Sequence, residues 1–164
     1  MVLLGAGNLV HPRKGVVEYG VPALRLLDEP RLYALTVGAR GDELELPCPS
    51  RALGALSDPV AIALGYQAAD VYLCPTIADA GPLMIPESLL CGTPVVAFDV
   101  GYAADLVRDG ETGYVVRSRD PRDLAAALHT GRFGEMRAAC RAAAAHHAPA
   151  RVVDAHVRIY RSLL

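Results

Sequence analysis

The sequence lacks an excess of charge of either sign. Sixteen Lys and Arg residues stand against 18 Asp and Glu over 164 residues, which leaves a formal net charge of −2 at pH 7. The pI is near 6.2. Such a balance offers no general attraction to nucleic acid or to an anionic membrane. We therefore expect no nucleic-acid partner, and any site for an anion must be local.

Long hydrophobic runs are also absent. No apolar stretch approaches the roughly 18 residues of a membrane span, and no charged leader precedes Gly5. Residues 1–4 therefore predict the start of a first strand rather than a signal peptide. The cysteines show no CxxC spacing, which favours unpaired thiols in a reducing compartment over disulfides or a metal site. These cysteines are Cys48, Cys74, Cys91 and Cys140. From these features we expect a cytoplasmic protein.

Two binding motifs fail in detail. Gly5-Ala6-Gly7 begins like a dinucleotide fingerprint, but the third residue after Gly7 is Val10, so the G-x-G-x-x-G pattern is not completed. This disfavours a nicotinamide-dependent oxidoreductase. The histidines of the C-terminal segment have no acidic or Cys partners at ligand spacing, so we expect no metal site there.

Predicted strands and helices alternate along the chain. Apolar runs predict strands at residues 2–7, 31–38, 51–57, 71–75, 94–100 and 113–117. Helical patterns cover residues 15–27, 60–70, a segment from about 83, and the region from 121 onward, with a break near 148–149. The last three strands are continuously apolar, which is typical of strands covered by helices on both faces. We therefore predict the α/β class: a single doubly wound, Rossmann-like domain with a parallel sheet.

The stretch DAGPLMIPESLLCGTPVV, residues 79–96, is more specified than a surface turn needs to be. In a doubly wound sheet, ligands bind beyond the carboxyl ends of the strands. The loop at residues 76–82 leads from such a strand to a helix N-terminus, whose first N–H groups suit a phosphate or a sugar hydroxyl. Gly81 would let the backbone approach a ligand closely. Pro86 is tolerated because it lies in the first helical turn.

Residues 79–101, DAGPLMIPESLLCGTPVVAFDVG, resemble the donor-side signature of retaining GT-B glycosyltransferases of family 4, the glycosyl transferases group 1. That signature is an acid, seven residues, and Glu-Ala-x-Ala-x-Gly-x-Pro-Val-Val. GNLVHPRKG at 7–15 resembles the family's anion-binding loop, and LVRDGETGYVV at 106–116 resembles a later strand. The resemblance covers roughly residues 2–128. It implies half of a GT-B fold: residues 1–164 as the C-terminal, sugar-nucleotide-binding domain, with the acceptor-side domain absent.

The resemblance also implies roles for single residues. Asp79, Lys14 and Glu87 would form the catalytic centre. Glu87 would accept hydrogen bonds from the ribose hydroxyls of a nucleotide-sugar, while Asp79 and the turn Ala80-Gly81-Pro82 would address the donor sugar. Lys14 and Arg13 would neutralise the diphosphate. GT-B enzymes do not generally need a metal or another cofactor, so none is expected.

Other positions complete the expected nucleotide site. Leu83 would follow the turn at the start of the helix. LGALSDP at 53–59, which includes Gly54 and Leu56, and YQAADVYLCPT at 66–76 resemble the segment that reaches the base, with uridine and guanosine both open. Two positions depart from the family pattern. Asn8 replaces the usual Arg after the first-loop glycine, and an Asp replaces the first Glu of the signature.

Each assignment has a structural alternative. Lys14 and Arg13 could be a solvated loop pair, Glu87 could complement a helix dipole, and Asp79 could cap the approach to the helix. Two classes of function also stay open. The first is the donor half of a hexosyltransferase for polysaccharide or glycoconjugate biosynthesis, inactive alone and reaching a membrane only through its other half. The second is a noncatalytic nucleotide-sugar-binding or interaction module.

Overall fold

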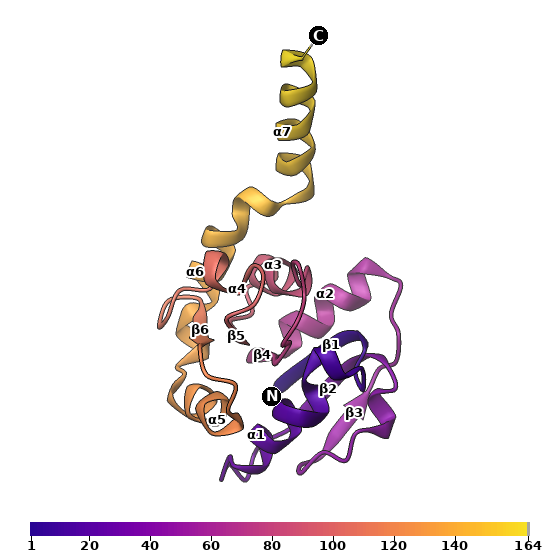
Figure 1. Ribbon diagram of the computed structural model, residues 1–164, viewed down its shortest axis with the longest axis vertical. Coiled ribbons are helices and arrows are strands. Elements are labelled where there is room, and N and C mark those ends of the chain that lie inside the picture. Colours follow the sequence, from indigo (N-terminus) through magenta and orange to yellow (C-terminus); the bar gives the residue numbers. More distant parts are fainter. Residues whose placement is uncertain (164) are drawn as a thin grey trace.

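The six strands of the protein form one parallel sheet. The computed structural model describes residues 1–163, and its sheet has the order β3-β2-β1-β4-β5-β6 (Figure 1). Every neighbouring pair of strands runs parallel. The strands are β1 Val2–Asn8, β2 Ala34–Ala39, β3 Ser50–Ala52, β4 Val71–Cys74, β5 Val95–Phe98 and β6 Gly113–Val116. This order is doubly wound, with its switch point between β1 and β4. The predicted fold class is confirmed.

Helices cover both faces of the sheet. Helix α1 packs with α5, and α3 packs with α2, α4 and α6 (Figure 1). The helices are α1 Val21–Arg25, α2 Pro59–Ala68, α3 Met84–Leu90, α4 Ala103–Leu106, α5 Pro121–Thr130 and α6 Phe133–Ala144. All residues of β4 and β5 are buried between these layers. Each Val or Leu buried there contributes about 1.5–3 kcal/mol relative to an exposed position.

Local signals place the helix starts correctly. At α2, the side chain of Asp58 accepts a hydrogen bond from the Val60 N–H at 2.9 Å, and Pro59 occupies the first helical position. Pro86 lies in the first turn of α3, as expected. The predicted helix at 15–27 is present in two pieces, a π-helical turn at Val16–Gly20 followed by α1.

The predicted strand at residues 51–57 is wrong over most of its length. Strand β3 spans only Ser50–Ala52, at the edge of the sheet, and the following residues have no regular structure until α2 begins. Gly54 has a φ of +70°, a left-handed conformation that ends an extended segment. The apolar run that suggested a strand instead places Leu53 and Leu56 against the core from an irregular loop.

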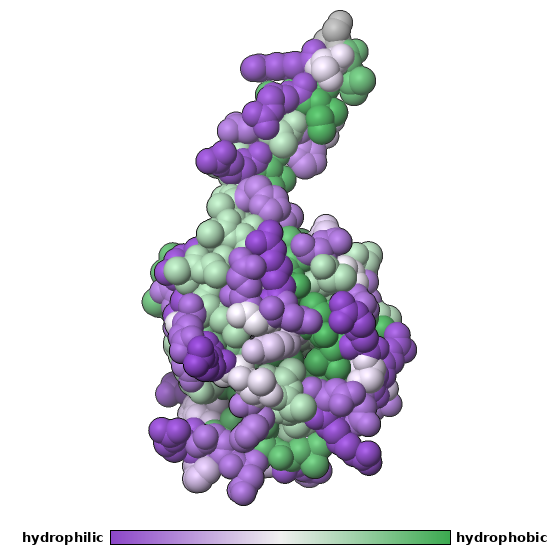
Figure 2. Space-filling model, turned by 90° about the vertical axis from the view of Figure 1, so that its left-hand side faces the viewer, coloured by the Kyte–Doolittle hydropathy of each residue, from purple (hydrophilic) through white to green (hydrophobic). Residues whose placement is uncertain are grey.

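The C-terminal segment leaves the body of the protein. After a 3-10 turn at Ala145–His147, helix α7 (Pro149–Ser162) projects outward, and none of its residues is buried (Figure 1). The predicted break at residues 148–149 is confirmed. Figure 2 shows hydrophobic side chains along one side of the projecting helix. Val153, Ile159 and Tyr160 are each more than half exposed.

The structure also describes the cysteines, the length of the apolar helices and the grouping of side chains that could bind a metal. All four cysteines are free thiols. Among residues 1–163, no helix is long and apolar enough to cross a bilayer. The same part of the chain contains no cluster of three or more His, Cys, Asp or Glu residues that could hold a metal ion.

Candidate functional site

The loops after β1 and β4 meet at the switch point of the sheet. The Ile77 N–H donates to the Arg13 carbonyl at 2.9 Å, which ties the two loops together. Gly15 has a φ of +65°, and a Cβ at this position would lie 2.0 Å from the carbonyl oxygen of Pro75. Only glycine fits such a conformation and so close an approach. The two predicted binding loops are therefore one structural unit.

Lys14 and Asp79 form an ion pair between these loops. The Lys14 Nζ donates to Asp79 Oδ2 at 2.6 Å, and each side chain is only 17% exposed. The other carboxylate oxygen accepts from the Gly81 N–H at 3.2 Å. The hydrogen bond from Lys14, and then that from Gly81, hold the pKa of Asp79 below its ordinary value of 3.8. Lys14 is therefore not a solvated loop charge.

Asp79 does not cap helix α3. Its carboxylate closes a turn on Gly81, two residues on, whereas the N-cap of α3 is Leu83 and has no side-chain cap. Asp79 thus shapes the approach to the helix without capping it. Leu83 itself is 65% exposed at the start of the helix.

Asn8 and Arg13 behave differently from Lys14. The Asn8 Oδ1 accepts from the Val10 N–H at 3.2 Å, so the oxygen of this side chain closes its own loop. Arg13 is exposed, and its guanidinium makes no hydrogen bond or ion pair with the described residues. Arg13 is thus a solvated charge, while Lys14 is the better fixed cation.

Glu87 lies on the exposed surface of α3, where its carboxylate is held from behind. The hydroxyl of Tyr66, in α2, donates to Glu87 Oε2 at 3.1 Å. Tyr66 is only 1% exposed. Burial and then the Glu87 carboxylate raise the pKa of Tyr66 well above 10, so its hydroxyl stays a neutral donor. Glu87 is a first-turn acid, so the dipole alternative is compatible with its position but does not account for this bond.

The turn at Ala80, Gly81 and Pro82 becomes more buried along its length. A Cβ on Gly81 would lie 2.5 Å from Cε2 of Tyr102, the residue before α4. A side chain at this position would therefore have to displace the tyrosine ring, a contact that the sequence did not indicate. Ala80 is exposed and Pro82 is buried, so Ala80 is the more accessible of the two.

Gly54 and Leu56 lie in the irregular loop after β3. No atom lies within 4 Å of the place where a Cβ of Gly54 would be, so its surface is open. Its carbonyl accepts from the Gly38 N–H at 2.7 Å, which joins this loop to the carboxyl end of β2. Leu56 is half-buried against the core. The expected base-binding loop thus lies at the carboxyl ends of β2 and β3.

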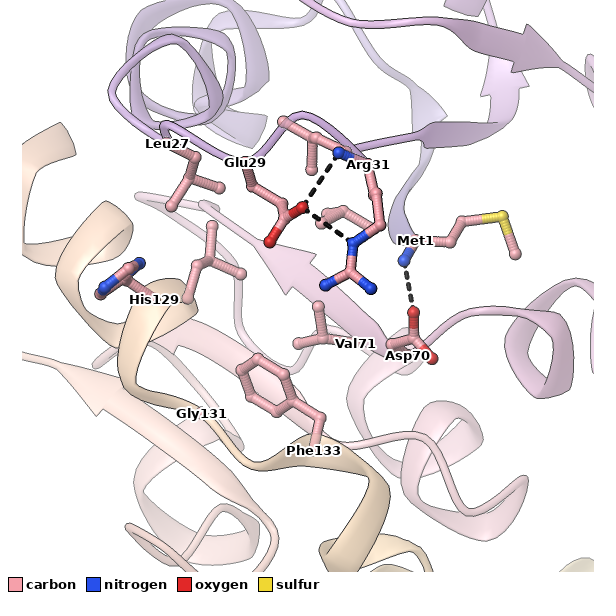
Figure 3. A pocket seen from close by; sticks show the side chains of 12 residues that line it. Met1, Leu27, Glu29, Arg31, Asp70, Val71, His129, Gly131 and Phe133 are labelled. Atoms are coloured by element: carbon pink, nitrogen blue, oxygen red, sulfur yellow. Dashed lines mark hydrogen bonds and ion pairs between the residues drawn. The ribbon is translucent and has the colours of Figure 1, made fainter.

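A hollow of about 480 Å³ lies at the opposite end of the sheet (Figure 3). It is lined by Val2 and Val71, at the amino ends of β1 and β4, and by Phe133. The ion pair of Glu29 and Arg31 lies at this hollow and is largely exposed. None of the predicted site residues lines this hollow. Because ligands of doubly wound sheets bind at the carboxyl ends, the candidate site is the surface formed by the two loops and α3.

Sequence reasoning did not give Tyr66 or Tyr102 a role of its own in this site. Tyr66 begins the segment 66–76 that resembles the base-binding part of the family, but it lies 21 residues from Glu87 and no local pattern pairs the two. Tyr102, which follows β5, lies against Gly81, which follows the neighbouring strand β4. The only signal for Tyr102 was its place directly after the signature at residues 79–101.

A family model and several proteins of known name match this chain. A family model described as glycosyl transferases group 1 matches residues 1–130. A D-inositol 3-phosphate glycosyltransferase of Geodermatophilus obscurus is 37% identical over 145 residues, covering 78% of this chain and 32% of that protein. A phosphatidyl-myo-inositol mannosyltransferase of Mycobacterium leprae is 35% identical over 137 residues, covering 77% and 36%.

Solved structures share the fold along the whole chain. A sucrose-phosphate synthase from Thermosynechococcus elongatus superposes with a TM-score of 0.78 at 25% identity, covering 99% of this chain and 45% of that chain. The Anabaena protein HepE in complex with UDP gives 0.77 at 22% identity, covering 99% and 49%. The chain therefore spans about a third of the two curated relatives and less than half of each solved chain.

Proposed function

Because the chain belongs to the glycosyl transferases group 1 family, we propose that it is the donor-binding half of a retaining glycosyltransferase. It binds a UDP- or GDP-sugar and presents the sugar to an acceptor held by a second, acceptor-side domain. The observation that carries this proposal is the pair of Lys14 and Asp79, 2.6 Å apart at the switch point of the sheet. It places a cation and a carboxylate side by side where such folds bind nucleotides.

The chemistry needs both charges of this pair. The difficult event in the transfer is the departure of a nucleoside diphosphate from a sugar that gains oxocarbenium character. Lys14 has three N–H donors, of which one is engaged by Asp79, so two can face the diphosphate oxygens. A fixed cation of this kind stabilises the leaving charge without reorganisation. Asp79, on the other side of the pair, addresses the donor sugar.

Glu87 gives the nucleotide its second anchor. An exposed carboxylate on α3, close after the Asp79 loop, is suited to accept hydrogen bonds from two ribose hydroxyls. Both named relatives are glycosyl-transferring proteins by name, which supports the reaction class. HepE binds UDP, and this supports UDP as the first ligand to try, with GDP beside it.

The partner of this chain is the acceptor-side domain, in the same protein or in another subunit. The share of the solved chains that is covered, 45% and 49%, is consistent with a second half of similar size. Helix α7 supports the same proposal, because its large side chains Val153, Ile159 and Tyr160 are each more than half exposed and none of its residues is buried against the described body. Burial of such a surface contributes about 25 cal/mol per Å². Any contact with a membrane would come through the acceptor-side half.

A noncatalytic nucleotide-sugar-binding module is the second candidate. The observation that favours it is the Asn8 side chain, whose oxygen is used inside its own loop. This leaves Lys14 as the one partly buried cation of the two predicted ones, Lys14 and Arg13. If the full parent protein transfers sugar and its Lys14→Ala variant does not, the protein is an enzyme. If the full protein binds the donor but transfers no sugar, it is a binding module.

Titration calorimetry tests the nucleotide site directly. Wild type, Glu87→Ala and Glu135→Ala are titrated with UDP, GDP and pyrophosphate. Glu135 is a matched control, because it is a first-turn acid of α6 as Glu87 is of α3. We expect Glu87→Ala to weaken the preferred nucleotide about tenfold or more, from hydrogen bonds to a charged group worth about 1.5–3 kcal/mol, and to leave pyrophosphate unchanged. Equal losses for both ligands would remove Glu87 from the ribose, and no nucleotide binding by wild type would refute the function.

A further inference from the structure

Tyr66 stands behind the proposed ribose-binding carboxylate. Its hydroxyl donates to Glu87 Oε2 at 3.1 Å, while Glu87 itself is exposed on α3. An exposed glutamate on a helix samples several rotamers, and binding a ligand would have to select one of them. A donor fixed in the core can make that selection before the ligand arrives.

The position of Tyr66 does not depend on Glu87. Its backbone carbonyl accepts from the Thr93 Oγ1 at 2.6 Å. Its ring meets the ring of Tyr72 edge to face, with 5.9 Å between the centroids. Arg137 from α6 donates to the carbonyl of Ala69, just after α2, at 2.6 Å. These contacts hold the end of α2 and the ring of Tyr66, so they fix the position of the hydroxyl without help from Glu87.

The second tyrosine reaches the other side of the site. The Tyr72 hydroxyl donates to the Gly5 carbonyl at 3.1 Å, in the strand that leads to the Lys14 loop. Tyr66 and Tyr72 are each 1% exposed and in contact with one another. They differ in one respect that matters: only Tyr66 donates to a side chain of the proposed site. Tyr72 is therefore a matched control for the loss of a buried hydroxyl.

We propose that Tyr66 is a positioning residue for nucleotide binding, which holds one oxygen of Glu87 so that the other is available to the ribose hydroxyls. The inference rests on the proposed function, since it requires that Glu87 contacts the ribose. If the Tyr66 hydroxyl had only a structural role, its loss would weaken the fold. The affinity for every ligand would then fall alike, whether or not the ligand has ribose hydroxyls.

The test measures the affinity of each of several variants for two ligands, one with and one without ribose hydroxyls. Wild type, Tyr66→Phe, Tyr72→Phe, Glu87→Ala and the double variant of Tyr66 and Glu87 are titrated with UDP or GDP, whichever wild type binds more tightly, and with its 2′,3′-dideoxy analogue. We expect Tyr66→Phe to weaken the ribonucleotide about three- to tenfold, the effect of one hydrogen bond, and to leave the dideoxy analogue unchanged. Tyr72→Phe should not discriminate between the two ligands. The double variant should bind no more weakly than Glu87→Ala.

Failure of the two ideas is separable. If Glu87→Ala loses the ribonucleotide and its dideoxy analogue equally, the ribose contact of the proposed function is wrong. If Glu87→Ala discriminates and Tyr66→Phe binds both ligands like wild type, or loses both equally, the positioning role is overturned while the ribose contact stands. Melting temperatures of all variants are recorded beside the titrations.

A second measurement covers the case in which Tyr66→Phe does not fold. Wild-type protein carrying [ζ-¹³C]tyrosine is examined by NMR with both ligands. Ribose binding to Glu87 should change the hydrogen bond of the Tyr66 hydroxyl, so a tyrosine resonance should shift with the ribonucleotide and not with the dideoxy analogue. Identical tyrosine shifts with the two ligands would overturn the proposal.

Discussion

Replacing Lys14 by alanine removes the partly buried cation of the site and leaves the Asp79 carboxylate with the Gly81 N–H alone. Charge-assisted hydrogen bonds to a diphosphate contribute about 1.5–3 kcal/mol, or about ten- to a hundredfold in affinity. Because Asp79 already takes part of the Lys14 charge at 2.6 Å, we expect a loss of UDP or GDP affinity near tenfold. Arg13→Ala should cost less than about threefold, since that side chain is exposed and unbonded among the described residues; a solvated charge contributes little.

Asp79→Asn gives the opposite prediction for the same ligand. The change removes a negative charge beside the proposed diphosphate site and releases Lys14 from its ion pair. Nucleoside diphosphate should therefore bind as tightly as to wild type or more tightly, while the contact that we propose between Asp79 and the donor sugar should be lost. Opposite directions for two members of one ion pair are hard to produce by a general loss of structure.

Titration calorimetry with UDP, GDP and the uncharged nucleosides measures these effects. An independent readout is available because Lys14 is the only lysine in the chain. Acetylation of its amine, followed by mass spectrometry, should be slowed by the nucleotide in wild type. The reasoning is refuted if Lys14→Ala binds diphosphate like wild type, or if it loses nucleoside and diphosphate to the same extent.

Three further predictions concern stability, pH and transfer. Gly15→Ala should lower the free energy of unfolding by more than about 3 kcal/mol, because a Cβ would lie 2.0 Å from the Pro75 carbonyl oxygen, whereas Gly54→Ala, with a similar φ and open space, should cost about 1 kcal/mol; equal urea midpoints for the two variants would contradict this. The lowered pKa of Asp79 means that its pair with Lys14 stabilises the fold above pH 3.8, and that this contribution disappears as the pH falls through the lowered value. The free energy of unfolding of wild type should therefore exceed that of Asp79→Asn by about 1 kcal/mol at pH 7. If the difference between their urea midpoints is the same at pH 3 as at pH 7, the ion pair does not contribute this stability. The 164-residue chain alone should transfer no sugar to any acceptor, because one domain cannot hold two substrates together; robust turnover in a radiolabelled-donor assay would sink the half-enzyme proposal.

The sequence was sufficient for the family and the fold class. Continuous apolar runs identified β4, β5 and β6 as strands covered on both faces, and Asp58 with Pro59 marked the start of α2. These features depend on contacts within a few residues, so a local pattern is enough to find them. The same reading selected Lys14 and Asp79 from opposite loops, though only the resemblance, and no local rule, connected them.

Only the tertiary structure decided how these residues meet. Lys14 and Asp79 are 65 positions apart, and Tyr66 and Glu87 are 21 apart; both pairs exist because strand order brings β1 beside β4 and packs α2 against α3. The residues after Ala52 leave the sheet edge despite an apolar pattern, since Gly54 turns the chain away. Sequence patterns encode which face of an element is apolar, but side-chain partners are chosen by the order in which the elements assemble, and no window of neighbouring residues contains that order.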